Sequence, residues 1–107
     1  MTNEEFPQLF QFLGAYFHED WMSEFDVADD VVKSFIADSE ACVILDVIKE
    51  TEAVSALDLT EEHMRDFLLI EMGCSYCYWH EWQDGVTWLK HVLVMLRQPP
   101  QKLISEY

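Results

Sequence analysis

The sequence predicts an all-α fold, a compact bundle of about five helices in which residues 1–107 form a single domain. Three observations lead to this prediction. The chain has the length of one domain, and 50% of its 107 residues are hydrophobic, enough for a core without disulfide bonds. Only three glycines and three prolines interrupt it, and the alternating runs of an all-β fold do not recur. Apolar residues instead repeat every three or four positions.

Two helices are expected in the first third of the chain. The apolar stripe over residues 6–17 predicts the first, with Pro7 in its first turn, where the missing N–H leaves no helical bond unmade. Residues 18–26 break this period and predict a loop that is pinned by its large aromatic side chains. Asp26 then stands where a helix cap is expected, ahead of a second apolar stripe over residues 27–36.

Three further helices complete the prediction. Residues 40–53, with Ser39 as the cap, carry apolar side chains around most of the helix circumference, which predicts a central position. Thr60 caps the next helix, which has acids in its first turn and Gly73 at its C-terminal end. The stripe over residues 85–97 predicts the last helix, which ends before a Pro-Pro pair.

The chain is strongly acidic. Twenty-one Asp and Glu against six Lys and Arg give a formal net charge of −15. Such a field repels nucleic acid and anionic lipid, so the expected partner is a cationic protein, with no nucleic acid and no membrane. Residues 1–53 hold thirteen acids and two bases, whereas residues 58–107 hold eight and four. The attractive face is therefore expected in the first half.

The sequence also favours a cytoplasmic protein. No stretch approaches the roughly 20 apolar residues of a membrane span, and the first residues, MTNEEFPQ, are acidic, unlike those of a signal peptide. Three cysteines, an odd number, fit reduced thiols better than a disulfide framework. We expect the free protein to be a monomer.

The segment GCSYCYWHEW, residues 73–82, places Cys74, Cys77 and His80 at three-residue intervals. A zinc site needs four ligands, and the fourth would have to come from a distant part of the chain: Cys42, His63 or His91. A redox pair would need nearby cations or a helix N-terminus, whereas this pair follows a predicted helix C-terminus. We favour packing, in which aromatic residues fill the connection and the cysteines are small apolar fillers. A metal-dependent or thiol enzyme built on these residues stays an alternative.

No other motif predicts catalysis. Carboxylate pairs such as Asp29-Asp30 and Glu61-Glu62 fall on predicted polar surfaces, where nothing drives the two pKa values apart. The four histidines stand beside no nucleophile turn, and the chain has no Gly-rich phosphate loop. The sequence therefore predicts a protein that is not an enzyme and binds no cofactor or metal.

A second motif lies in residues 12–39, FLGAYFHEDWMSEFDVADDVVKSFIADS. It has the pattern Tyr-Phe-x-x-Asp-Trp, formed by Tyr16, Phe17, Asp20 and Trp21, followed by a helix that ends in Phe-Ile-Ala-Asp at residues 35–38. This arrangement resembles the immunity proteins of bacterial contact-dependent growth inhibition systems, the CdiI-type proteins. Trp88-Leu89 agrees with the family more loosely, and residues 40–80 lie outside the resemblance.

The resemblance implies a small cytosolic protein that binds and neutralises the C-terminal toxin domain delivered by a neighbouring cell, commonly a nuclease. The acidity points the same way, because an enzyme that cleaves RNA or DNA needs a basic groove, which an acidic protein can occupy. Occlusion of the toxin's active site is the mechanism we favour, and binding beside that site is the alternative. An acidic regulatory adaptor or nucleic-acid mimic that binds a basic host protein is the alternative function.

The densest exposed acidity predicts the residues that contact the toxin. They are Glu19, Asp20, Glu24, Asp29 and Asp30, with Glu61 and Glu62 as a second group. Large aromatic residues are usually buried, so Tyr16, Phe17 and Trp21 are expected to build the corner after the first helix, with Asp20 as its cap. A buried apolar anchor is also expected in the interface, but the sequence does not identify it.

Overall fold

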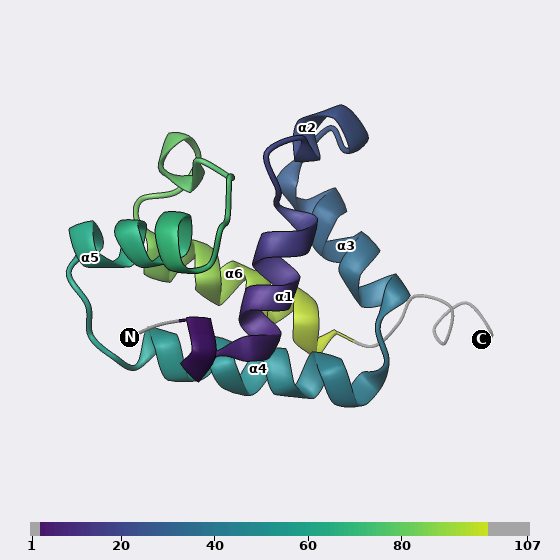
Figure 1. The fold of residues 1–107 in the computed structure, drawn as a ribbon, viewed down its shortest axis with the longest axis horizontal. Helices are drawn as coiled ribbons and strands as arrows, with labels where there is room; N and C mark the ends of the chain where they lie inside the picture. Colours follow the sequence, from purple (N-terminus) through teal and green to yellow (C-terminus); the bar gives the residue numbers. More distant parts are fainter. Residues whose placement is uncertain (1–2, 99–107) are drawn as a thin grey trace.

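Residues 3–98 are described in a computed structural model, and all regular structure within them is helical (Figure 1). The elements in chain order are η1 (Asn3–Glu5), α1 (Pro7–Tyr16), α2 (Trp21–Glu24), α3 (Ala28–Asp38), α4 (Ala41–Ser55), α5 (Glu61–Asp66), η2 (Phe67–Glu71), η3 (Tyr78–His80) and α6 (Gly85–Arg97). The short η1 and η3 are 3-10 helices, and η2 continues α5 as a π-helix. The five predicted helices correspond to α1, α3, α4, α5 with η2, and α6, which confirms the all-α prediction.

Two helices begin at side-chain caps. Thr60 Oγ1 accepts from the His63 N–H at 3.2 Å and begins α5, as predicted. Asp84 Oδ1 accepts from the Thr87 N–H at 2.8 Å and begins α6. At the other end of the α5 segment, Gly73 adopts φ 66°, the left-handed conformation that closes a helix and that side chains disfavour. Each of these features depends on residues within one helical turn, so helix ends of this kind can be predicted from the sequence.

The caps predicted at Asp26 and Ser39 are wrong. The cap position before α3 is Val27 and the one before α4 is Glu40, and neither start has a side-chain hydrogen bond to the backbone. Each predicted cap lies one residue too early, and the chain enters both helices through an extended residue with no short polar side chain to bond the first turn. Asp26 is consequently exposed and free to act as a surface charge.

Buried side chains of α1 and α6 belong to one hydrophobic core. α1 packs against α3 and α4, and α6 packs against α3, α4 and α5, so these two helices hold the others together. Leu9, Phe12 and Leu13 of α1 and Trp88 and Leu89 of α6 are buried. Complete burial of a large apolar side chain contributes about 1.5–3 kcal/mol, so each of these residues adds substantially to the stability of the fold. Among the described residues, no helix is long and apolar enough to span a bilayer.

The prediction that residues 40–53 form the central helix is wrong. α4 lies along one edge of the molecule, the lower edge in Figure 1. It packs mainly on α1 and α6, and two neighbours on the same side cover only one face of a helix. Val47, Thr51 and Val54 are buried on that face, whereas Leu45 is 56% exposed.

The residues of the aromatic motif join α1, α2 and α3 at one corner. The Tyr16 hydroxyl donates to Asp38 Oδ2 at 3.1 Å, and its ring meets Phe35 edge-on at 5.3 Å between centroids. Phe17 meets Trp21 edge-on at 5.7 Å. The two halves of the motif therefore bind each other in space, and the predicted structural role of Tyr16, Phe17 and Trp21 agrees with these contacts.

The loop predicted over residues 18–26 contains a short helix, α2. Trp21 is buried and Phe25 half-buried, so the aromatic residues hold this segment as predicted. Asp20 holds the N-cap position of α2, as predicted, but its side chain caps no backbone N–H, and its carbonyl oxygen makes the link instead. That oxygen accepts from the Ser23 hydroxyl at 2.7 Å and from the Ser23 N–H at 3.0 Å. The Asp20 carboxylate is left facing solvent.

Candidate functional site

The surface of the α1–α2–α3 corner is acidic. Residues 18–32 contain six acids and no Lys or Arg. We call this set the acidic corner, and it consists of Glu19, Asp20, Glu24, Asp26, Asp29 and Asp30. The first four are exposed, and the last two are half-buried in the first turn of α3. Carboxylates gathered without cations among them produce a negative local potential that attracts cationic partners.

Two acids of this corner have histidine partners. His18 Nε2 lies 3.4 Å from Glu24 Oε1 at the surface. His91 Nε2 lies 2.9 Å from Asp29 Oδ1 and so joins the first turn of α3 to α6. The His91 ring also packs on Trp82, with 4.8 Å between centroids. Asp29 is therefore a structural link as well as a surface charge, and a substitution there would disturb the packing of α3 on α6.

A groove with a volume of about 380 Å³ opens beside the acidic corner. One wall comes from α2 and the start of α3: Trp21, Met22, Asp26, Val27 and Ala28. The other comes from the connection between η2 and α6: Ser75, Tyr76, Cys77, His80 and Glu81. In Figure 1, α2 and the turn of η3 lie at the same end of the molecule, the upper end. We call this feature the corner groove, and each of its walls contributes one carboxylate.

The base of the corner groove is held rigidly. Tyr76 stacks on Phe17 and meets Trp21 edge-on, both at 5.7 Å between centroids. The Ser75 N–H donates to the Phe17 carbonyl at 2.8 Å, and the Tyr76 hydroxyl donates to Glu81 Oε1 at 2.7 Å. Burial, and then the hydrogen bond to the Glu81 carboxylate, raise the pKa of Tyr76 well above its ordinary value. The groove is thus preformed, with an aromatic base that is already packed.

Two large apolar side chains are exposed at the corner groove. Met22 is 70% exposed and Val27 is 52% exposed, although both line it. Single exposed apolar residues are normal on protein surfaces, but two that share a groove are typical of an interaction site. The groove therefore offers apolar contact surface at its walls and negative charge around it.

The Cys74, Cys77 and His80 motif does not form a cluster. Residues 73–77 form an irregular connection and His80 ends the short η3, so no regular period places the three side chains on one face. Cys74 is buried, which raises the pKa of its thiol to about 12, whereas Cys77 and His80 are exposed. Packing is thus confirmed for Cys74, but Cys77 is not a core filler. Within residues 3–98 no three His, Cys, Asp or Glu side chains are placed to hold a metal ion.

Glu61 and Glu62 do not join the acidic corner. They begin α5, which lies on the other side of α1 from α2 and α3 in Figure 1. Glu61 faces inward and accepts from the Tyr78 hydroxyl at 2.7 Å and from the Gly85 N–H at 2.8 Å. Burial, and then this hydrogen bond, raise the pKa of Tyr78. Glu62 is exposed and is the member of the pair available to a partner.

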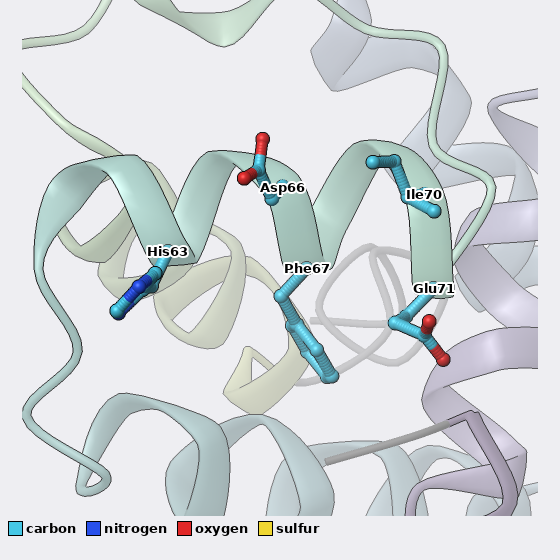
Figure 2. A pocket seen from close by; sticks show the side chains of 5 residues that line it. All are labelled: His63, Asp66, Phe67, Ile70 and Glu71. Atoms are coloured by element: carbon cyan, nitrogen blue, oxygen red, sulfur yellow. The ribbon is translucent and has the colours of Figure 1, made fainter.

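A second depression, of about 210 Å³, lies on α5 and η2 (Figure 2). It is lined by His63, Asp66, Phe67, Ile70 and Glu71. Figure 2 shows the Asp66 and Ile70 side chains on one side of the helix and the Phe67 side chain on the other. Ile70 is 72% exposed, and all five residues come from one continuous helical segment. This depression therefore lacks the second wall that encloses the corner groove.

Sequence reasoning located the acids of the corner but missed Met22, Val27 and Glu81, and it assigned Asp26 to a cap. One signal was present for Met22, an apolar residue with no stripe to join in an acid-rich segment that breaks the helical period. Val27 is predicted as the first residue of the apolar stripe over 27–36, and that prediction is wrong, since Val27 is 52% exposed. Residues 21–28 meet residues 75–81 only through tertiary packing, so no local sequence pattern predicts the contact.

The chain is similar to known proteins. The family described as CdiI immunity protein matches residues 5–96. Among solved structures, the chain is similar to one in the crystal structure of a CdiA-CT/CdiI complex from Y. kristensenii, with 32% sequence identity and a TM-score of 0.86. The similarity covers 90% of this chain and 97% of that chain. No curated protein matches the sequence. From the extent of the family match, we conclude that the chain belongs to the CdiI immunity protein family.

Proposed function

We propose that this protein binds the toxin domain of its cognate contact-dependent growth inhibition system in the cytosol and neutralises it without catalysis. The observation that carries the proposal is the similarity of nearly the whole chain to one found in a CdiA-CT/CdiI complex. Membership of the immunity protein family supports the same function. The partner is then the C-terminal toxin domain, and the protein is a monomer until it binds that domain.

The acidic corner favours a nuclease as the toxin. An enzyme that cleaves RNA or DNA binds phosphates through Lys and Arg, so its substrate groove is basic. A surface with six carboxylates and no Lys or Arg presents the opposite charge and competes with the substrate for that groove. Such complementarity also speeds association, up to the order of 10⁸–10⁹ M⁻¹s⁻¹ at low salt. The proposed mechanism is therefore occlusion of the toxin's substrate groove.

The proposed contact residues are the exposed acids of the corner. Glu19, Asp20, Glu24 and Asp26 face solvent, and half-buried Asp30 stands beside them in the first turn of α3. Asp29 adds to the same field while it holds His91. Glu62 belongs to a separate surface, where a large toxin domain would make a second, weaker contact.

Growth protection tests this proposal. The toxin domain encoded beside this chain is expressed from an inducible promoter, with and without the chain, and cell growth and nucleic acid integrity are followed. The proposal predicts growth arrest with degraded RNA or DNA in the first case, and normal growth with a co-purifying complex in the second. Arrest despite expression of the folded chain would contradict neutralisation. Arrest with intact nucleic acid would contradict the nuclease assignment, and capture of a basic host protein alone would favour the adaptor alternative.

A further inference from the structure

We infer that the corner groove is the anchor site of the toxin interface, and that it seats an apolar side chain of the toxin with Lys or Arg on either side. This inference rests on the proposed function, since it states where the bound toxin makes its most desolvated contact. The occupant is thus a basic protein domain that presents an exposed apolar residue.

The acidic corner alone does not account for tight binding. Exposed charges at the rim of an interface mainly raise the association rate, and each surface ion pair contributes about 0–1 kcal/mol. Long-lived complexes depend on a few desolvated apolar anchors near the centre of the interface. Four of the six acids in the corner are exposed, so the anchor must lie on neighbouring surface.

The corner groove has the form of an anchor site. Met22 and Val27 are exposed where apolar contact would bury them, and the Trp21 and Tyr76 rings beneath are already fixed by packing. A preformed site loses little conformational entropy on binding. The volume of about 380 Å³ lies within the range of roughly 300–1,000 Å³ that is typical of binding pockets.

The charge of the groove walls favours a basic occupant. Asp26 lies on one wall of the groove and Glu81 on the other, so an apolar group that enters passes between carboxylates. Cationic side chains beside that group would pair with them, which is what a basic toxin domain provides. A second copy of this chain is disfavoured as the occupant, because two molecules with a formal charge of −15 repel each other.

The other exposed apolar residues lack this combination. Leu45 on α4, Leu57 just after α4 and Val94 on α6 are exposed, and none of them lines the corner groove. Ile70 lines the smaller depression of Figure 2, which comes from one helical segment. These residues therefore provide controls for substitutions in the corner groove.

Cysteine alkylation tests the inference in the unmodified protein. Cys77 lines the corner groove and is exposed, and Cys42 is exposed at the start of α4, along the opposite edge of the molecule. Cys74 is buried and serves as the unreactive reference. The free protein and its purified toxin complex are treated with iodoacetamide, and the rate at each cysteine is read by mass spectrometry. We expect the complex to slow labelling of Cys77 tenfold or more, while Cys42 keeps its rate.

Substitution provides the second measurement. Met22→Ser and Val27→Ser remove apolar surface without changing charge, and Leu45→Ser is the matched control on α4. We expect the combined groove variant to dissociate from the toxin about tenfold faster or more, with an unchanged association rate, and the control to behave as the natural protein does. If the groove variant does not fold, the labelling of the natural protein still decides the question.

The outcomes separate this inference from the proposed function. A stable complex in which Cys77 stays as reactive as in the free protein would overturn the anchor assignment and leave neutralisation standing. Faster dissociation of the Leu45→Ser or an Ile70→Ser variant, with the groove variant unaffected, would move the anchor to those surfaces. Absence of any complex with the natural protein would overturn the proposed function itself, and the inference with it.

Discussion

Single polar side chains in this protein join helices that are distant in sequence. The Glu61 carboxylate accepts from Tyr78 and from the N–H of Gly85, and so connects the starts of α5 and α6 through η3. The Glu50 carboxylate on α4 accepts from the Leu9 N–H in the first turn of α1 at 2.9 Å. A half-buried N–H or O–H donor that loses such an acceptor finds no other acceptor nearby. These carboxylates therefore contribute more to the stability of the fold than typical surface carboxylates do.

Substitution of Glu61 tests this role. We expect Glu61→Ala to lower the free energy of unfolding by about 2–3 kcal/mol, because two donors lose a charged acceptor. Urea denaturation measures the change. Glu62→Ala is the matched control, since Glu62 is the exposed neighbour and substitutions at such sites usually change stability by less than about 0.5 kcal/mol. Equal losses in the two variants would show that Glu61 is not a structural link.

Buried tyrosines make the fold sensitive to alkali. The folded state raises the pKa of Tyr76 and Tyr78 above the ordinary value of 10.0, chiefly through burial. The unfolded chain therefore releases these protons at lower pH than the folded chain. This contribution to stability is fully present below about pH 10 and is lost as the pH rises above it. Urea unfolding at a series of pH values from about 9 to 11 should show a falling free energy, with a shallower fall for Tyr78→Phe. A free energy that stays constant over this range would contradict the assignment.

At the scale of the element, prediction succeeds where one turn of helix contains its own signals. α5 begins at Thr60, and its segment closes at Gly73, because a hydroxyl cap and a left-handed glycine act locally. α4 shows the limit of sequence prediction. Its apolar residues indicate a helix, but they do not indicate how many neighbouring helices will cover it. The corner groove shows the same limit of sequence prediction. Its two walls meet only through tertiary packing: one is α2 with the start of α3, and the other is residues 75–81.

The N-caps provide an element-scale prediction. Asp84→Ala should lower the free energy of unfolding by about 1 kcal/mol, because the Thr87 N–H loses its acceptor at the start of α6. Asp26→Ala should leave stability unchanged, since the Asp26 side chain caps no helix. Thermal unfolding of both variants provides the comparison. A larger loss for Asp26→Ala would restore the cap that the sequence predicts and contradict the structure.

The hydrogen bonds from Thr87 also lower the pKa of Asp84. The Asp84 contribution to stability is therefore present above the ordinary carboxyl pKa and is lost as the pH falls through the lowered value. Asp84→Ala should accordingly matter less in acid than at neutral pH. The difference in free energy of unfolding between the two proteins, measured against pH, checks this expectation, and a difference that is constant down to about pH 2 would contradict it.

At the scale of the whole molecule, both the net charge and the position of the charged residues affect how the protein attracts a partner. The formal charge of −15 gives the protein a negative field, and the acidic corner concentrates part of it beside the corner groove. A basic toxin domain would be drawn to that corner before any apolar contact forms. The field then determines how fast the partners meet, and the groove determines how long they stay together.

Charge reversal separates the corner from the total charge. We expect Glu19→Lys combined with Asp30→Lys to slow toxin association by the order of tenfold at low ionic strength. Salt screens exposed charges, so the difference from the natural protein should narrow as the salt concentration rises. Glu4→Lys combined with Asp46→Lys is the control, because both residues are exposed outside the proposed contact surfaces and the change in net charge is the same. Equal slowing by both pairs would mean that only the total charge matters. Asp29 is left intact because of its bond to His91.

Titration of the purified toxin domain tests the central claim most directly. The rate of RNA or DNA cleavage is measured at a fixed toxin concentration while this protein is added in steps. Neutralisation by binding predicts that cleavage falls in proportion to the protein added and stops at a fixed molar ratio. Full cleavage in the presence of excess folded protein would contradict the account, and so would complete inactivation by a small fraction of that ratio, which would indicate catalysis instead of binding.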